Sequence, residues 1–100
     1  MVKIIDAKAE EERKKQRFSK IAEIALEIWG ERAEVSEPSR ILIYPDSERR
    51  PIGKIINIDV PPYMDIQVRV PEESYFDDAM HFSKECERKL KEEVTLSTSY

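Results

Sequence analysis

The sequence predicts an α+β fold, a two-layer sandwich in the order helix, three-stranded antiparallel meander, helix (αβββα). Two observations predict it. Apolar residues recur at helical spacing near both ends of the chain, and three runs rich in β-branched residues lie between them, separated by short linkers that contain proline. Residues 1–100 are of the usual size for a single domain, and we expect its core over about residues 18–94.

The first helix is predicted over residues 6–29. Asp6 can cap it, because its carboxylate can accept a hydrogen bond from a free first-turn N–H, and Gly30 follows at the usual position of a left-handed C-terminal cap. The front half, residues 8–17, has almost no apolar face, so we expect it to project beyond the core or to meet a partner. Residues 2–5 allow a short extra strand at the N-terminus. The apolar stripe comprises Phe18, Ile21, Ala22, Ala25, Ile28 and Trp29, with Ile24 and Leu26 on its two sides.

The three strand-like runs are dominated by β-branched residues. In the second and third runs, apolar and polar residues alternate strictly, which predicts one buried face and one wet face. The first run is apolar on both sides, because Ile41 and Ile43 alternate with Leu42 and Tyr44. This pattern predicts either a homodimer through the sheet or a helix on one side and a loop on the other. The runs lie at residues 40–44, 54–60 and 66–70.

The second helix is predicted over residues 74–94. Ser74 and Asp77 resemble a capping box at its start, with Asp where Glu is usual. The polar residues 95–100 are predicted to form a frayed tail. The predicted inner face of the helix comprises Phe76, Ala79, Met80, Ser83, Cys86, Leu90 and Val94.

Composition narrows the class of protein. Charged residues make up 38% of the chain, which has one Asn and two Gln, a bias typical of proteins from thermophiles. The single cysteine forms no internal disulfide, no apolar run approaches the ~20 residues of a membrane span, and the start does not resemble a signal peptide. We therefore expect a cytoplasmic protein. Its net charge of −4 disfavours generic binding of polyanions.

The residue types present disfavour catalysis. The single histidine and the single cysteine lie five residues apart on one predicted helix, on different faces. The chain has no Gly-x-Ser-x-Gly element, and two glycines are too few for a phosphate-binding loop. Pro45-Asp46 resembles the first half of the Pro-Asp…Asp/Glu-x-Lys nuclease motif, but Ile52 stands two residues before Lys54, where a second carboxylate is needed. We predict a protein that is not an enzyme and has no cofactor.

One helical stripe has the spacing of metal ligands. Asp77 and Glu85 lie four residues before and after His81, so all three can line up on one face. Three donors on one exposed helix leave an ion under-coordinated, and a solvated charged face is the alternative interpretation. Cys86 lies on the apolar stripe of the same helix, where a small buried side chain is expected.

Basic residues of the first helix and the first β-hairpin predict nucleic-acid binding if they lie on one side of the fold. The order helix, three strands, helix is similar to that of double-stranded RNA-binding domains. Acidic residues, however, stand where those domains carry lysines at the start of the last helix, and these would repel phosphate. The candidate residues are Arg13, Lys14, Arg17, Lys20, Arg40, Arg49, Arg50 and Lys54.

Residues 65–94 resemble the last strand–helix unit of the cytoplasmic domain of cation-diffusion transporters. The run Asp65-Ile-Gln-Val-Arg-Val-Pro is followed by Asp77-Asp78-Ala79 and an acidic and basic helix. Gln67 stands where that family has a metal-binding His, and His81 is out of register by one residue with its helical His. The resemblance therefore implies a strand–turn–helix unit, and no family is assigned on it.

Taken together, these patterns predict a small non-enzymatic interaction or regulatory protein. We expect it to act through self-association, as a homodimer, or through a protein partner, because no residues form a credible catalytic set and a sheet with an open face or edge must be covered or protected. Nucleic-acid binding by the first helix and first hairpin is the alternative function.

Overall fold

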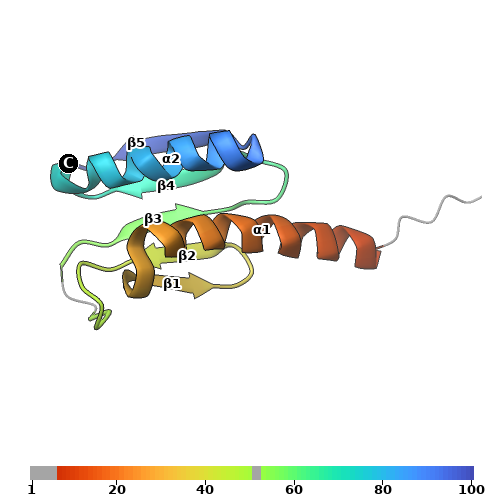
Figure 1. Ribbon diagram of the computed structural model, residues 1–100, viewed down its shortest axis with the longest axis horizontal. Helices are drawn as coiled ribbons and strands as arrows, with labels where there is room; N and C mark the ends of the chain where they lie inside the picture. Colours follow the sequence, from red (N-terminus) through yellow and green to blue (C-terminus); the bar gives the residue numbers. More distant parts are fainter. Residues whose placement is uncertain (1–6, 51–52) are drawn as a thin grey trace, which may run out of the picture.

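In the computed structural model, which describes residues 7–50 and 53–100, two helices lie on one face of a five-stranded sheet (Figure 1). The fold is α+β, as predicted, and neither helix is long and apolar enough to cross a membrane in the part of the chain that is described. The elements are α1 (Ala7–Trp29), the 3-10 turn η1 (Gly30–Arg32), β1 (Ala33–Ser36), β2 (Arg40–Ile43), β3 (Ile56–Asp59), β4 (Ile66–Val70), the 3-10 turn η2 (Glu73–Tyr75), α2 (Phe76–Leu90) and β5 (Val94–Thr98).

The strands lie side by side in chain order, from β1 to β5. The first four pair antiparallel, and β5 pairs parallel to β4 after the chain crosses over through α2. The register aligns apolar residues across the sheet, with Ile41 opposite Ile58, Ile58 opposite Val68 and Val68 opposite Leu96. This row therefore runs through four strands on a single face.

The prediction of three strands in a purely antiparallel meander is wrong at both edges. Residues 33–36 contain a single β-branched residue and gave no strand signal, but they form β1 as the first arm of a hairpin with β2. Residues 94–98 form β5, where a frayed tail was predicted from residue 95 onward. Val94 and Leu96 alternate with Thr95 and Ser97, a pattern too short to have been recognised as a strand, and pairing with the outer edge of β4 orders the segment.

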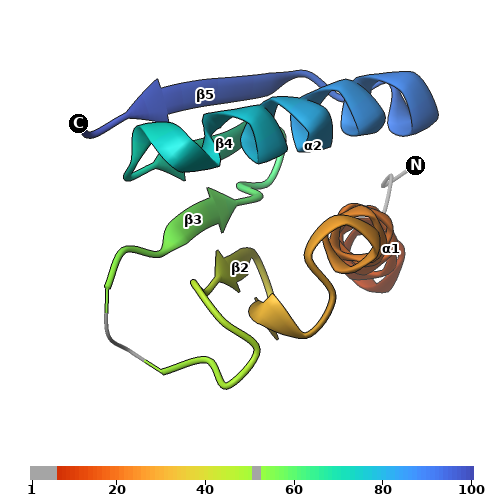
Figure 2. The same cartoon turned by 60° about the vertical axis from the view of Figure 1, so that its left-hand side comes forward.

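Both helices bury their apolar residues in one core on the same face of the sheet. Figures 1 and 2 show α1 over the β1–β2 side and α2 over the β4–β5 side. The helices also meet each other, since the ring centroids of Trp29 and Phe82 are 5.5 Å apart. The core therefore has three contributors, α1, α2 and one sheet face, and the predicted two-layer arrangement is confirmed.

For α1, the predicted stripe is largely confirmed. Phe18, Ile21, Ala22, Ile24, Ala25 and Trp29 are buried and Ile28 is half-buried, whereas Leu26 is 44% exposed. Gly30 has a φ of +58°, the left-handed conformation expected after the helix. The front half of α1 projects beyond the sheet (Figure 1). The predicted cap at Asp6 and the possible strand at 2–5 lie outside the described residues.

The prediction for α2 is wrong in its bounds and partly wrong in its inner face. The helix ends at Leu90, because Lys91 takes a φ of +58° and its N–H donates back to the Glu87 carbonyl. It starts after η2, with no side-chain cap. Phe82 is fully buried, whereas Met80, predicted to face inward, is 36% exposed. The buried side is rotated because α2 packs against α1 as well as against the sheet.

Among the residues that the structure describes, no helix lies on the second face of the sheet (Figure 2). Tyr44 on this side is nevertheless only 8% exposed, and Leu42 is half-buried. The register gives two rows across this face that are polar except for Leu42. They are Glu34, Leu42, Asn57, Arg69 and Ser97, and Ser36, Arg40, Asp59, Gln67 and Thr95.

Candidate interaction site

The outer edge of β5 is open among the described residues, and its hydrogen-bonding groups can be assigned. The N–H of Ile66 donates to the Glu93 carbonyl and the N–H of Ser99 donates to the Val70 carbonyl, each at 3.1 Å. Main-chain groups alternate in direction along a strand, so residues 93, 95, 97 and 99 face β4. The N–H and C=O groups of the alternate residues therefore point outward. These residues are Val94, Leu96 and Thr98.

This edge is unprotected in composition as well as in geometry. Residues 94–100 carry no charge and no proline, although 38% of the whole chain is charged. Proteins usually guard an exposed edge with charges, proline, a bulge or a very short strand. The opposite edge does have such protection, because β1 is four residues long, carries Glu34 and leads directly into Glu37 and Pro38. The β1 edge of the sheet is therefore protected against strand addition, whereas the β5 edge is not.

The flank of α2 beside this edge is partly apolar. Successive helical residues turn by 100°, so Phe76, Met80 and Leu90 lie on the side away from Lys89. Lys89 faces α1, where its ammonium pairs with Glu27 at 3.0 Å. Phe76 and Leu90 are only partly buried against the core, and Met80 is 36% exposed. Ser83 and Glu87 share this flank, and α2 itself lies alongside β4 and β5 (Figure 1).

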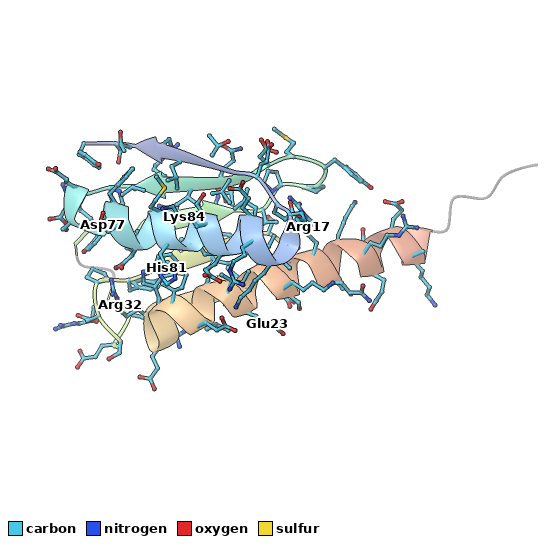
Figure 3. All side chains as sticks on the ribbon, turned by 45° about the horizontal axis from the view of Figure 1, so that its top comes forward. Arg17, Glu23, Arg32, Asp77, His81 and Lys84 are labelled. Carbon is cyan, nitrogen blue, oxygen red and sulfur yellow. The ribbon has the colours of Figure 1, made fainter. Side chains whose placement is uncertain are left out.

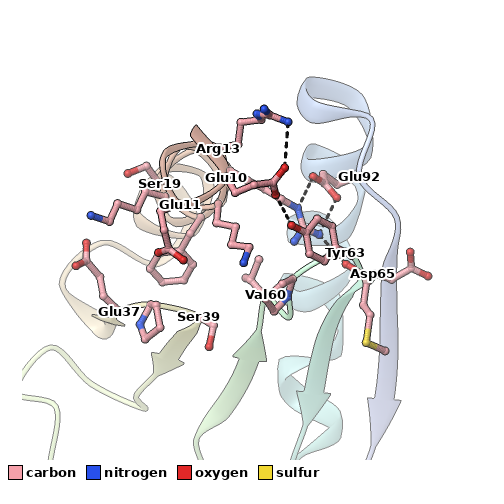
Figure 4. A pocket seen from close by; sticks show the side chains of 17 residues that line it. Glu10, Glu11, Arg13, Ser19, Glu37, Ser39, Val60, Tyr63, Asp65 and Glu92 are labelled. Carbon is pink, nitrogen blue, oxygen red and sulfur yellow. Dashed lines mark hydrogen bonds and ion pairs between the residues drawn. The ribbon is translucent and has the colours of Figure 1, made fainter. Parts of the chain in front are cut away.

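A cleft of about 820 Å³ lies at the end of the sheet, between the front half of α1 and the turns that precede β2 and β4 (Figure 4). Its floor includes Phe18 and Val60, which are buried, and exposed Met64. Its lining carries four cationic and five acidic side chains, so neither sign of charge dominates. The cations are Arg13, Lys14, Lys15 and Arg17, and the acids are Glu10, Glu11, Glu37, Asp65 and Glu92.

Arg17 ties this end of the fold together. Its guanidinium makes a bidentate pair with the Glu92 carboxylate, at 2.8 and 3.0 Å. It also donates to the main-chain carbonyls of Pro61 and Met64, at 3.0 and 2.7 Å. One side chain of α1 thus joins the β3–β4 turn to the segment between α2 and β5. Four of its five N–H donors are used within the chain.

The β3–β4 turn also displays Tyr63, which sequence reasoning missed. Its φ of +61° is unusual for a residue other than glycine, and 79% of the residue is exposed. The hydroxyl donates to the Glu10 carboxylate, and this hydrogen bond raises the pKa of Tyr63. The Lys14 ammonium lies 5.3 Å from the ring centroid, within cation–π range. The only signal in the sequence was an aromatic residue after two prolines.

The predicted nucleic-acid-binding residues fall into separate places. Arg13, Lys14, Arg17 and Lys20 lie in the first two thirds of α1, whereas Arg49 donates to the Glu31 carbonyl, just beyond the far end of that helix. About 24 Å of helix axis separates Arg13 from Trp29, at about 1.5 Å for each residue. The structure therefore brings each cluster together locally and does not join them into one patch.

Several of these cations also have acidic partners. Arg50 pairs with Asp46 at 2.8 Å and with Glu48 at 3.2 Å, and the hydrogen bond from Arg50 lowers the pKa of Asp46. Arg40 pairs with Asp59 at 3.0 Å on the open sheet face. Lys54 is exposed at the end of the β2–β3 loop. Asp46 therefore forms its contacts within the turn that follows β2. Ile52, which stands where the nuclease motif has its second carboxylate, lies outside the described residues.

The predicted metal stripe is arranged as an ion-pair network. Figure 3 shows Asp77 near the start of α2 and His81 farther along it. The imidazole lies 3.8 Å from Glu85, but this carboxylate also pairs with Arg88 at 2.7 Å, a bond that lowers the pKa of Glu85. Within residues 7–50 and 53–100, no three His, Cys, Asp or Glu side chains are placed to hold a metal ion.

Cys86 is fully buried, and desolvation raises the pKa of its thiol to about 12. Because the thiolate is the reactive form, we expect no reaction of the folded protein with Ellman's reagent at pH 8. The same protein in concentrated guanidinium should react with one equivalent. Rapid labelling of the folded protein, measured by absorbance, would contradict the burial of this side chain.

Comparisons with protein families, with curated proteins and with solved structures found no match for this chain. The function is therefore inferred from the fold and its surfaces. They define a small α+β protein with one open sheet face, one protected edge and one unprotected edge.

Proposed function

We propose that this protein is a small non-enzymatic interaction protein that acts through self-association at the outer edge of β5. The observation that carries the proposal is an uncharged edge strand with outward-pointing main-chain groups, in a chain that is charged almost everywhere else. Strand addition at such an edge supplies main-chain hydrogen bonds without any special side-chain chemistry.

The partly apolar flank of α2 also favours association at the β5 edge. A short strand pair alone is small compared with the roughly 1,200–2,000 Å² that specific interfaces bury. Phe76, Met80 and Leu90 stand beside the edge and add apolar surface that the folded chain leaves partly uncovered. A second copy brings an identical strand edge and an identical helix flank, so one partner supplies both the main-chain hydrogen bonds and the additional apolar contact.

Replacing Leu96 with proline tests this proposal. The Leu96 N–H points away from β4, so proline removes an outward donor without breaking the β4–β5 ladder. We expect the Leu96→Pro variant to have a dissociation constant about a hundredfold or more above that of the wild type, because the proline ring also blocks the close approach of a second strand. Sedimentation equilibrium over a range of concentrations measures this change.

Leu96→Ala is the matched control. It removes most of the same side chain but keeps the N–H, so it should associate more tightly than Leu96→Pro. Circular dichroism establishes that both variants are folded. A wild-type mass of 11.8 kDa at all concentrations, or equal association of the two variants, would refute self-association at this edge.

A further inference from the structure

We infer that two copies pair through antiparallel β5 strands about a two-fold axis at Leu96, so that the two five-stranded sheets form one continuous sheet. This inference rests on the proposed self-association. It adds the register in which the two β5 strands pair and the segments that each copy brings next to the other. It follows from three independent features of the edge, namely the direction of its main-chain groups, the position of α2 above it and the character of its side chains.

The outward main-chain groups select the register. An antiparallel pair forms two hydrogen bonds wherever two outward-facing residues stand opposite each other. With Leu96 opposite Leu96, Val94 of each copy stands opposite Thr98 of the other, and every outward N–H and C=O of β5 finds a partner. A two-fold axis at Thr95 or at Ser97 would leave Thr98 or Val94, respectively, of both copies without an outward-facing partner within the strand.

The side-chain faces agree with this register. Leu96 and Val94 lie on the helix-covered face of the sheet, and Thr95 and Ser97 lie on the open face. Facing residues of a strand pair lie on the same face, so the register sets Leu96 opposite Leu96 and Val94 opposite Thr98 on the helix-covered face of both copies. It places Thr95 of one copy opposite Ser97 of the other, which adds no charge to the open face.

The helices fit the same geometry. Neighbouring strands lie about 4.8 Å apart, so a helix above the middle of β4 and β5 is about 4.8 Å from the two-fold axis. The two copies of α2 are then about 10 Å apart, which is an ordinary distance between packed helices. Phe76, Met80 and Leu90 occupy the flank that meets the second copy, together with Ser83 and Glu87.

The same register brings Tyr100 of the second copy opposite Glu92. Tyr100 is 55% exposed in one chain, and Glu92 lines the cleft below α1 and holds Arg17. Each copy therefore extends its C-terminal residues toward the cleft of the other. The assembly has its two clefts at opposite ends, each beside a segment of the second chain.

Cysteine pairing tests the register. Thr95→Cys and Ser97→Cys are prepared as two separate full-length proteins, both retaining Cys86, which is buried. Opposite residues at this kind of position have Cα atoms about 4.5 Å apart, within the range of a disulfide. The two proteins are unfolded and refolded together, oxidised with glutathione disulfide, and examined by mass spectrometry, which separates heterodimers from homodimers.

We expect a disulfide-linked heterodimer in the mixture and none between two copies of either variant alone. Linked Thr95→Cys homodimers would place the axis at residue 95, and linked Ser97→Cys homodimers would place it at residue 97; either result overturns the inference. An associated protein that forms no disulfide in any sample also overturns it but leaves self-association intact. A protein that stays monomeric overturns both proposals.

Discussion

Replacing Phe82 with alanine is expected to lower the free energy of unfolding by about 3–5 kcal/mol. Phe82 is fully buried, and its ring meets Trp29 of α1 at a centroid distance of 5.5 Å. Truncation removes the apolar surface and leaves a cavity where α1, α2 and the sheet converge, and the surrounding structure closes such a cavity only partly. Chemical denaturation followed by circular dichroism measures the change.

Leu26→Ala is a suitable control for this prediction. Leu26 was expected beside the apolar stripe of the first helix, but it is 44% exposed, so its truncation should cost less than about 1 kcal/mol. If Leu26→Ala destabilises the protein as much as Phe82→Ala, the packing of the two helices described above is wrong. The comparison requires equal denaturant dependence of the unfolding free energy in both variants.

Replacing Arg17 with methionine is expected to lower the free energy of unfolding by about 2–4 kcal/mol. The change removes the bidentate pair with Glu92 and the bonds to the carbonyls of Pro61 and Met64, and it leaves these acceptors without their cation. The effect is below that of a fully buried pair because the Arg17 side chain is 24% exposed. Thermal and denaturant unfolding both report it.

Two variants define what this result means. Arg13→Met removes another cation of the same helix, but Arg13 is 72% exposed and makes a single pair with Glu10 at 3.4 Å, so we expect less than about 0.5 kcal/mol. Arg17→Lys keeps the charge but not the planar fork, so it should recover only part of the loss. Equal stabilities of Arg13→Met and Arg17→Met would show that Arg17 does not join the three segments.

Arg17 also shows why the site was hard to predict. In the sequence it is one of several cations in a basic helix, and it was grouped with residues that could bind phosphate. Whether a guanidinium faces water or neighbouring carbonyls depends on where the β3–β4 turn lies, and that turn is more than forty residues away in the chain. Tyr63 and the cleft below α1 arise from the same long-range packing.

Local periodicity was sufficient for the elements that bury a regular stripe. The spacing of Phe18, Ile21 and Ala25 placed the inner face of α1, and strict alternation placed the buried faces of β3 and β4. These patterns repeat with the period of the helix or strand that they form, so the position of a residue in the pattern predicts whether its side chain is buried or exposed. The α+β class, the antiparallel order of the central strands and the shared helical face follow from them.

The edges of the sheet and the rotation of α2 depend on contacts between distant segments. Val94 and Leu96 form an apolar stripe of only two residues between polar neighbours, and β5 is ordered because it pairs with β4. Phe82 stands three residues after Ala79 and four before Cys86, so helical spacing places it on the buried side of α2, and its contact with Trp29 of the other helix turns that side toward α1. The open edge on which self-association is proposed is thus a product of tertiary pairing, because hydrogen bonds between strands join residues whose separation in the chain carries no local signal.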